Sequence, residues 1–221
     1  MNSREIILQR IRSGLANAAA AGFGDLREPP APEVWPRKCP PPAALVAQFT
    51  EELNLLKGEP FHCPTIDAAK SQLAQLLESG GWSRLGCLDR PLLHDLTANS
   101  PAERIEWVGD AWTAYQIEQL PVALISAEAL LADTGSCVVH CNTAVERLMC
   151  YLPPVCIIAA RTSQLAEHLP AAWAPIAAAC RPQESRGEVV IITGPSRTAD
   201  IEKKLILGVH GPKRLILLVI E

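Results

Sequence analysis

Hydrophobic positions follow two spacings along the chain. Continuously apolar runs such as residues 189–192 are typical of strands buried on both faces, whereas apolar residues three or four positions apart are typical of amphipathic helices. Strands and helices that alternate predict an α/β fold: a Rossmann-like, mainly parallel sheet with helices on both faces. The predicted strands are residues 84–88, 104–108, 122–126, 137–141, 155–160, 189–193 and 215–220; the predicted helices are residues 66–78, 114–120, 143–151, 164–169, 175–180 and 198–207.

The beginning of the chain has a different pattern. Ile7, Ile11 and Leu15 recur at helical spacing and predict an amphipathic N-terminal helix. Seven prolines then fall within residues 29–42, where their fixed φ and missing N–H groups exclude a helix or a central strand. We therefore expect residues 1–42 to form a helix and a proline-rich arm, and residues 43–221 to form the α/β domain.

Composition and charge exclude several classes of binding partner. The 221 residues carry a formal net charge of −4, so the chain lacks the cationic field that holds nucleic acid, and we expect no nucleic-acid partner. No apolar run approaches the roughly 18 residues of a membrane span. Arg4, Glu5, Arg10 and Arg12 interrupt the place where a secretory signal has its apolar stretch. These features predict a cytoplasmic protein without a membrane span.

Eight scattered cysteines predict reduced and mostly buried thiols. Cys137 and Cys141 would share one face of a strand about 13 Å apart, too far for one metal ion or a disulfide. No C-x-x-C pattern occurs, so we expect neither a metal nor an iron–sulfur cluster in this chain. Neither a G-x-G-x-x-G after a strand nor a P-loop is present, which disfavours a bound dinucleotide. We therefore expect no cofactor.

One polar cluster follows the predicted strand 189–193. Gly194 permits close approach, Ser196 and Thr198 offer hydroxyl groups, and the planar fork of Arg197 suits a carboxylate or phosphate. With a helix opening near Asp200, the segment would bind an anion beyond the carboxyl end of its strand. A purely structural alternative stays open, in which a hydroxyl caps the helix and the acids complement its dipole. A serine hydrolase is rejected, because Thr198 replaces the second glycine of that motif.

Two further clusters complete the candidate site. Residues 208–212 hold His210 between glycines, and residues 197–214 contain five cations against two anions, which favours a small anionic ligand. Asp133 lies in a polar stretch and is placed to orient a ligand hydroxyl, although an Asx turn or a loop-capping histidine would explain these residues equally well. We expect Asp133 and Arg197 to face one cleft. The candidate ligand-binding residues are Asp133, Thr134, Gly135, Ser136, Gly194, Ser196, Arg197, Thr198, Asp200, His210 and Gly211, and the candidate catalytic residues are His210 and Asp133.

These motifs resemble a known family. The resemblance rests on four segments: residues 129–136 (ALLADTGS), the Leu-Pro pair at 152–153, residues 193–202 (TGPSRTADIE) and residues 208–212 (GVHGP). Together they are similar to the lactate utilization protein C family, or LUD domain. The departures are Ser136, where threonine is expected, and the two cysteines that flank the strand 137–141.

The resemblance implies a fold similar to the sugar-phosphate isomerase, CoA-transferase and folinate cyclo-ligase superfamily, with a pocket at strand ends. It also implies a non-redox subunit that helps oxidise L-lactate to pyruvate, alongside partner proteins that carry iron–sulfur clusters. The alternative is a free-standing isomerase, CoA-transferase or cyclo-ligase-like enzyme acting on a small carboxylate or phosphate. A third reading is a regulatory or scaffold protein. Whether the chain is itself an enzyme stays open.

Overall fold

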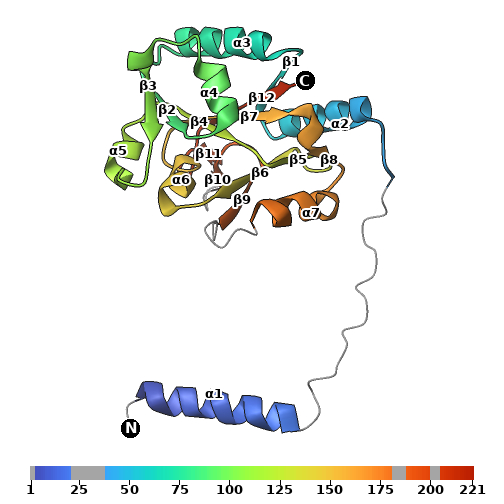
Figure 1. Ribbon diagram of the computed structural model, residues 1–221, viewed down its shortest axis with the longest axis vertical. Helices are drawn as coiled ribbons and strands as arrows, with labels where there is room; N and C mark the ends of the chain where they lie inside the picture. The colour runs from blue at the N-terminus through green and yellow to red at the C-terminus, as the bar shows by residue number, and fades with distance from the viewer. Residues whose placement is uncertain (1–2, 21–37, 181–187, 200–204) are drawn as a thin grey trace. The chain divides into compact units, whose positions relative to one another are not determined.

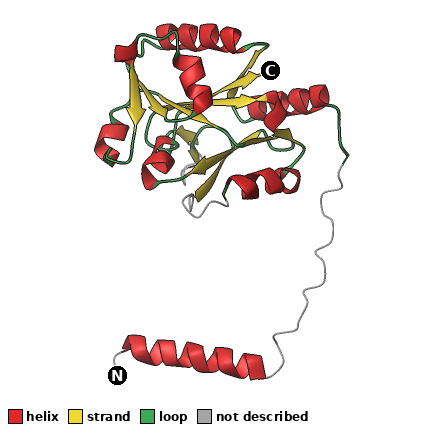
Figure 2. Ribbon diagram, viewed as in Figure 1, coloured by secondary structure: helices red, strands yellow, loops and turns green. Residues whose placement is uncertain are grey.

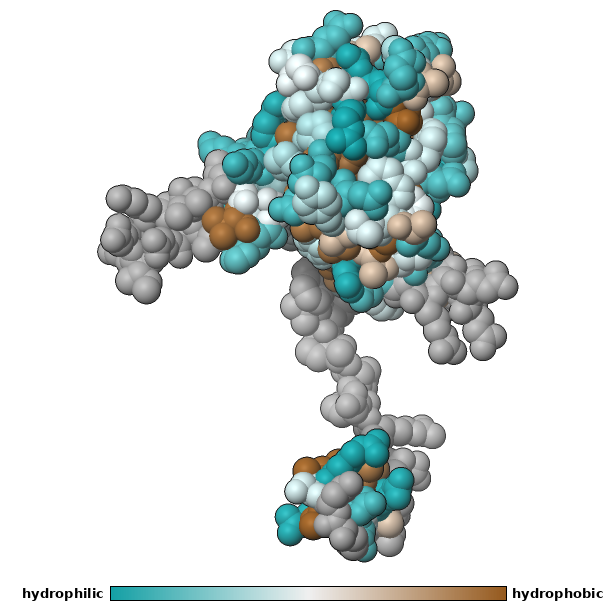
Figure 3. Space-filling model, turned by 90° about the vertical axis from the view of Figure 1, so that its left-hand side faces the viewer, coloured by the Kyte–Doolittle hydropathy of each residue, from teal (hydrophilic) through white to brown (hydrophobic). Residues whose placement is uncertain are grey.

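The computed structural model describes residues 3–20, 38–180, 188–199 and 205–221. The chain forms two compact units, Met1–Pro36 and Arg37–Glu221. In the first, the described residues form helix α1 (Ser3–Ala20), as the apolar spacing predicts. Its side chains Ile7, Ile11 and Leu15 are exposed, and Figure 3 shows hydrophobic surface on this helix. Most of the proline-rich segment lies outside the described residues, so the boundary at residue 42 stays a prediction.

The second unit is built on a six-stranded parallel sheet (Figure 1). Its central strands are buried almost throughout, as their continuously apolar sequences predict. A fully buried Leu or Ile contributes about 2 kcal/mol, so this sheet dominates the stability of the unit. The predicted α/β fold is confirmed. In spatial order the strands are β1 (Glu59–Cys63), β12 (Arg214–Ile220), β7 (Val155–Arg161), β4 (Ala123–Ser126), β2 (Leu85–Leu88) and β3 (Ile105–Val108).

Helices connect and cover the strands (Figure 2). Threonines begin several of them: the Thr65 hydroxyl accepts a hydrogen bond from the Ala68 N–H, and Thr113 and Gln116 form a capping box. None of the described helices combines the length and apolar character needed to cross a membrane. The helices are α2 (Pro42–Leu55), α3 (Ile66–Ser79), α4 (Pro91–Thr97), α5 (Ala114–Glu118), α6 (Ala144–Met149) and α7 (Leu169–Ala179), with 3-10 turns at Ala102–Arg104 and Thr162–Gln164.

A second, four-stranded sheet packs against the first. One face of β6 contributes Cys137, Val139 and Cys141 to the main core. Val138, on the other face, packs with Ile176 of α7 in a smaller core. This division follows from the alternation of side chains along a strand. The order is β8 (Leu165–Ala166), β5 (Ala129–Leu131), β6 (Ser136–Cys141) and β9 (Glu188–Ile192), with only the β8–β5 pair parallel.

Two predicted helices are wrong. Residues 198–207 contain no described helix; instead β10 (Arg197–Ala199) pairs antiparallel with β11 (Leu205–Leu207). The short apolar run of β11 suits a strand as well as a helix, and cross-strand pairing decides between them. Residues 164–169 form the end of a 3-10 turn and then β8, which pairs with β5. Helix α7 begins at Leu169 because His168 caps it and Pro170 suits its first turn.

Candidate functional site

The segment around Ser196 lies at the amino ends of two parallel strands. The Ser196 N–H donates to the Pro212 carbonyl at 2.9 Å, directly before β12. The Lys213 N–H donates to the Pro154 carbonyl at 2.8 Å, directly before β7. The preceding strand β9 belongs to the second sheet. The segment does follow the carboxyl end of its own strand, but the expectation that this strand belongs to the parallel sheet is wrong.

Arg197 bonds to the end of helix α2. Its guanidinium donates to the carbonyl of Leu56, the residue that caps α2. The final carbonyls of a helix lack partners within the helix, and a cation stabilises them further through the helix dipole. Gly194 has a φ of 87°, and a Cβ there would lie 3.0 Å from the Leu56 Cβ. The close approach that sequence reasoning assigned to a ligand is made to α2.

The turn at Asp133 packs against the same helix. Gly135 has a φ of 59°, and a Cβ there would lie 2.5 Å from the backbone nitrogen of Leu53. Only glycine fits such a position. The Asp133 N–H donates to the Glu167 carbonyl at 3.1 Å, which fixes the other side of the turn.

Hydroxyl groups join the two clusters in one chain of hydrogen bonds. The Ser136 and Thr193 hydroxyl oxygens are 2.8 Å apart. Ser136 donates to the Thr134 hydroxyl at 2.9 Å, and Thr134 donates to the Asp133 carboxylate at 3.2 Å. Such a chain is polarised toward its carboxylate end, and each bond strengthens the next. Segments 133–136 and 193–197 thus meet beside the end of α2.

A cavity of about 430 Å³ is lined in part by His210 and Gly211, whose loop contacts Ser196. The His210 N–H donates to the Ser196 hydroxyl at 3.4 Å. A Cβ on Gly211 would lie 3.2 Å from that of Ser196, so glycine allows the loop to approach. Burial raises the pKa of Tyr151, which keeps its phenol a neutral donor at pH 7. The lining residues are Glu118, Tyr151, Leu152, Pro154, Gly208, Val209, His210, Gly211 and Lys213.

Sequence reasoning missed Glu118 and Tyr151 in this cavity, because both come from segments distant from the motifs. Asp133 and Arg197, which were expected to face one cleft, do not line it. Asp200 and Glu202 lie outside the described residues, and Thr198 is described only through its backbone pairing with Ile206.

The cysteines lie mainly in the core. Burial raises the pKa of both Cys87 and Cys156 to about 12, so these thiols stay protonated near pH 7. Cys141 and Cys150 have their sulfurs 4.0 Å apart, a proximity that spacing along the chain did not predict. Within the described residues, no group of three or more His, Cys, Asp or Glu side chains is arranged to hold a metal ion.

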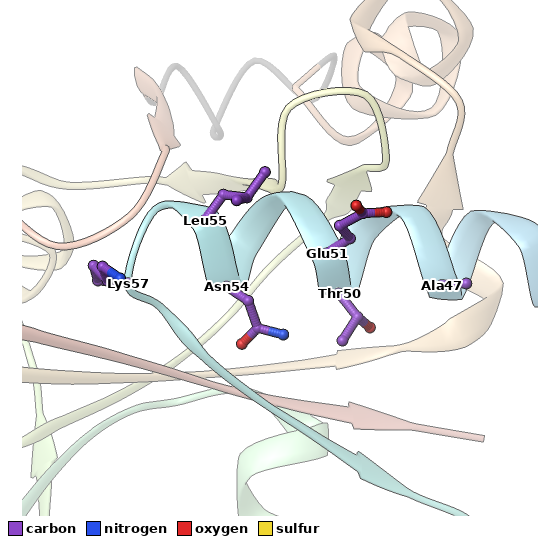
Figure 4. Close-up of a pocket in the computed structure, with 6 residues that line it drawn as sticks. All are labelled: Ala47, Thr50, Glu51, Asn54, Leu55 and Lys57. Atoms are coloured by element: carbon purple, nitrogen blue, oxygen red, sulfur yellow. The ribbon is translucent and has the colours of Figure 1, made fainter.

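Another cavity, of about 510 Å³, lies over the exposed face of α2 (Figure 4). Its lining comes from helix α2 and from Lys57, which follows the helix, so it is open and one-sided. The Thr50 hydroxyl there already bonds to His62 Nε2 at 2.7 Å. We assign it no ligand.

Comparison with known proteins identifies the family. The LUD domain model matches residues 46–220, which include the Asp133 turn, the Arg197 segment and the His210 loop. The chain belongs to the LUD domain family. This LUD domain is similar to lactate utilization protein C of Bacillus pumilus (29% identity over 105 residues, 47% of this chain and 44% of the relative). It is also similar to lactate utilization protein C of Bacillus licheniformis (30% identity over 138 residues, 59% of this chain and 55% of the relative).

The LUD domain therefore spans about half the length of the curated relatives it matches. A solved structure has the same fold: a DUF162 family protein from Deinococcus radiodurans superposes with a TM-score of 0.61 at 17% identity. The match covers 82% of this chain and 99% of the other. At this identity the likeness concerns the fold alone.

Proposed function

We propose that this LUD domain protein is a non-redox component of an L-lactate utilization system, in which partner proteins carrying iron–sulfur clusters perform the electron transfer. The observation that carries the proposal is the family match over residues 46–220, together with relatives named for lactate utilization. The division of labour is supported by the placement of Cys87, Cys137 and Cys156, which are buried in the apolar core and not gathered at the surface.

The second part of the proposal is a small anionic ligand bound beside the motif residue His210. Lys213 offers a positive charge, and Tyr151 offers a neutral hydroxyl donor to the same cavity. Such groups bind carboxylates and phosphates through charge-assisted hydrogen bonds. Ser196 positions the His210 loop, while Arg197 and the Asp133 turn fix the surrounding backbone against α2. In this arrangement His210 is the proposed acid or base if a proton is transferred.

Deletion of the gene tests the first part. The deletion strain should fail to grow on L-lactate and should grow normally on pyruvate. Wild-type protein should restore growth, and the purified complex should contain stoichiometric iron and sulfide from its partners. Arg104→Gln, a change on the 3-10 turn before β3 that lines neither the His210 cavity nor the α2 cavity, is the matched control. Normal growth of the deletion strain on L-lactate would reject the proposal.

A further inference from the structure

A third cavity, of about 500 Å³, lies at the carboxyl ends of the parallel strands. Arg161 ends β7, Glu221 follows β12, and Pro64 follows β1. Ser196 and Pro212, from two of the motifs, lie at the opposite, amino ends of β7 and β12. Open parallel sheets bind ligands at their carboxyl ends, where loops and helices begin. The cavity is lined by Pro64, Thr65, Ile66, Lys70, Asp95, Ala98, Arg161 and Glu221.

Two oppositely charged side chains in this cavity, Arg161 and Asp95, do not pair with each other. In the described part of the chain, the Arg161 guanidinium makes no hydrogen bond and no ion pair, although Asp95 and Glu221 line the same space. Among the same residues the Asp95 carboxylate also has no hydrogen-bond or ion-pair partner; only its backbone carbonyl accepts a bond, from the Ala98 N–H. If Arg161 and Asp95 formed an ion pair with each other, neither group would be available to a ligand. Their separation leaves a positive and a negative group available on different walls of one cavity.

Hydrogen bonds to the backbone hold the cavity walls in place. The Arg161 N–H donates to Gln164 Oε1 at 2.6 Å, and Gln164 Nε2 donates to the Ala127 carbonyl at 2.6 Å. The Glu221 N–H donates to the Cys63 carbonyl at 3.1 Å, which joins the carboxyl ends of β12 and β1. A ligand would therefore bind to positions that already exist, without the cost of ordering a loop.

The hydroxyl of Thr65 adds a donor. Its oxygen accepts from the Ala68 N–H at 3.1 Å, so its hydrogen is free to point elsewhere. Lys70 forms an ion pair with the exposed Asp67 at 3.0 Å and brings a second positive charge to the cavity wall. A carboxylate can therefore receive bonds from Arg161 and Thr65, while Asp95 needs a donor from the ligand. An anion without a hydroxyl group would be repelled by Asp95 and Glu221 and would offer neither carboxylate a hydrogen-bond donor.

We propose that this cavity binds a small hydroxycarboxylate, with the carboxylate on Arg161 and the hydroxyl donating to Asp95. The choice of L-lactate as the probe rests on the proposed function; the existence of the cavity does not. A 2-oxoacid such as pyruvate keeps the carboxylate and loses the hydroxyl donor, so Asp95 distinguishes the two acids.

Isothermal titration of the full chain with L-lactate and with pyruvate tests the proposal. Arg161→Gln should weaken binding of both acids at least tenfold, because a charge-assisted bond is lost. Asp95→Ala should lower the ratio of lactate affinity to pyruvate affinity at least threefold. Arg104→Gln should change neither affinity. Both cavity variants should melt within about 2 °C of the wild type, since their side chains have no described partners to lose.

Unchanged lactate binding in Arg161→Gln would overturn the proposal, as would the absence of lactate binding to the wild type. An equal effect of Asp95→Ala on both acids would overturn the assignment of the hydroxyl. The two proposals also fail separately. If the deletion strain cannot use lactate but Arg161→Gln binds it normally, the cavity assignment fails alone. If the strain grows on lactate while Arg161 is needed for binding, the proposed function fails alone.

Discussion

At the amino ends of β1, β7 and β12, polar groups of the motif residues bond to one another and to α2; at the carboxyl ends of the same strands, Arg161 and Asp95 face a cavity without described partners. The first arrangement uses its hydrogen-bonding groups to hold the chain in place. The second leaves such groups for a ligand. The most recognisable sequence motifs of this LUD domain therefore include residues whose first task is structural, such as Ser136, Thr193 and Arg197, whereas Arg161 and Asp95 lie in segments without a motif.

The largest expected effect concerns the amino end. Gly135→Ala would place a Cβ 2.5 Å from the Leu53 nitrogen at a φ of 59°, so it should lower the free energy of unfolding by at least about 3 kcal/mol. Gly81→Ala is the matched control, because Gly81 has a φ of 63° and open space around it. That change should cost only about 1–2 kcal/mol of backbone strain. Equal losses in urea unfolding would mean that the contact with α2 does not constrain the turn.

High pH should lower the free energy of unfolding, because two buried thiols, Cys87 and Cys156, lie in the core of the parallel sheet. The folded state keeps the protons of Cys87 and Cys156 up to a pKa of about 12, whereas the unfolded state loses them near 9.0. Because the unfolded state then binds fewer protons, stability falls as pH rises from about 9 to 12. Each thiol should cost about 1.4 kcal/mol by pH 10.

Urea unfolding at pH 8 and pH 10 measures this loss, and Cys87→Ala should reduce the difference by about 1.4 kcal/mol. An unchanged difference in Cys87→Ala would show that this thiol does not titrate as described. The stabilities of variants at the two ends of the sheet should be compared below about pH 8.5, where thiol titration contributes little.

The two arginines should differ in their effect on stability. Arg197→Gln removes a charged donor from the Leu56 carbonyl and should cost about 1–2 kcal/mol. Arg161→Gln should stay within about 0.5 kcal/mol of the wild type, because it breaks no described bond. Urea unfolding of the two variants side by side checks this contrast. Equal losses would remove the distinction between the structural role of Arg197 and the ligand-binding role of Arg161.

The smallest effect is the coupling of the two motif clusters. A double-mutant cycle of Ser136→Ala and Thr193→Val should give an interaction energy of about 0.5–1.5 kcal/mol, as expected for a hydrogen bond between buried or partly buried hydroxyls. Additive losses in the cycle would mean that the hydroxyl chain does not connect the clusters.

Periodicity predicted the central sheet well, because strands such as β7 and β12 are continuously apolar. It missed β1, whose Pro60 and exposed His62 suit a sheet edge paired only with β12. It also misread residues 198–207, since a short apolar run does not separate strand from helix until its pairing partner is known.

The candidate site residues also fall into those that the sequence predicted and those that it did not. Local turn chemistry identified segments 133–136 and 193–197, and the structure brings them together through Ser136 and Thr193. The carboxyl-end cavity left no local signal, because Thr65, Asp95 and Arg161 are single residues on separate elements. The strand order β1-β12-β7 brings Thr65 and Arg161 together, and the packing of α4 against α3 adds Asp95.

Amide chemical shifts of ¹⁵N-labelled protein during titration with L-lactate test the central claim most directly. We predict that saturable shifts occur at Thr65, Asp95 and Arg161 and disappear in Arg161→Gln. Shifts confined to the loop around His210, or none at all, would contradict the claim that the carboxyl ends of the strands hold the hydroxycarboxylate site.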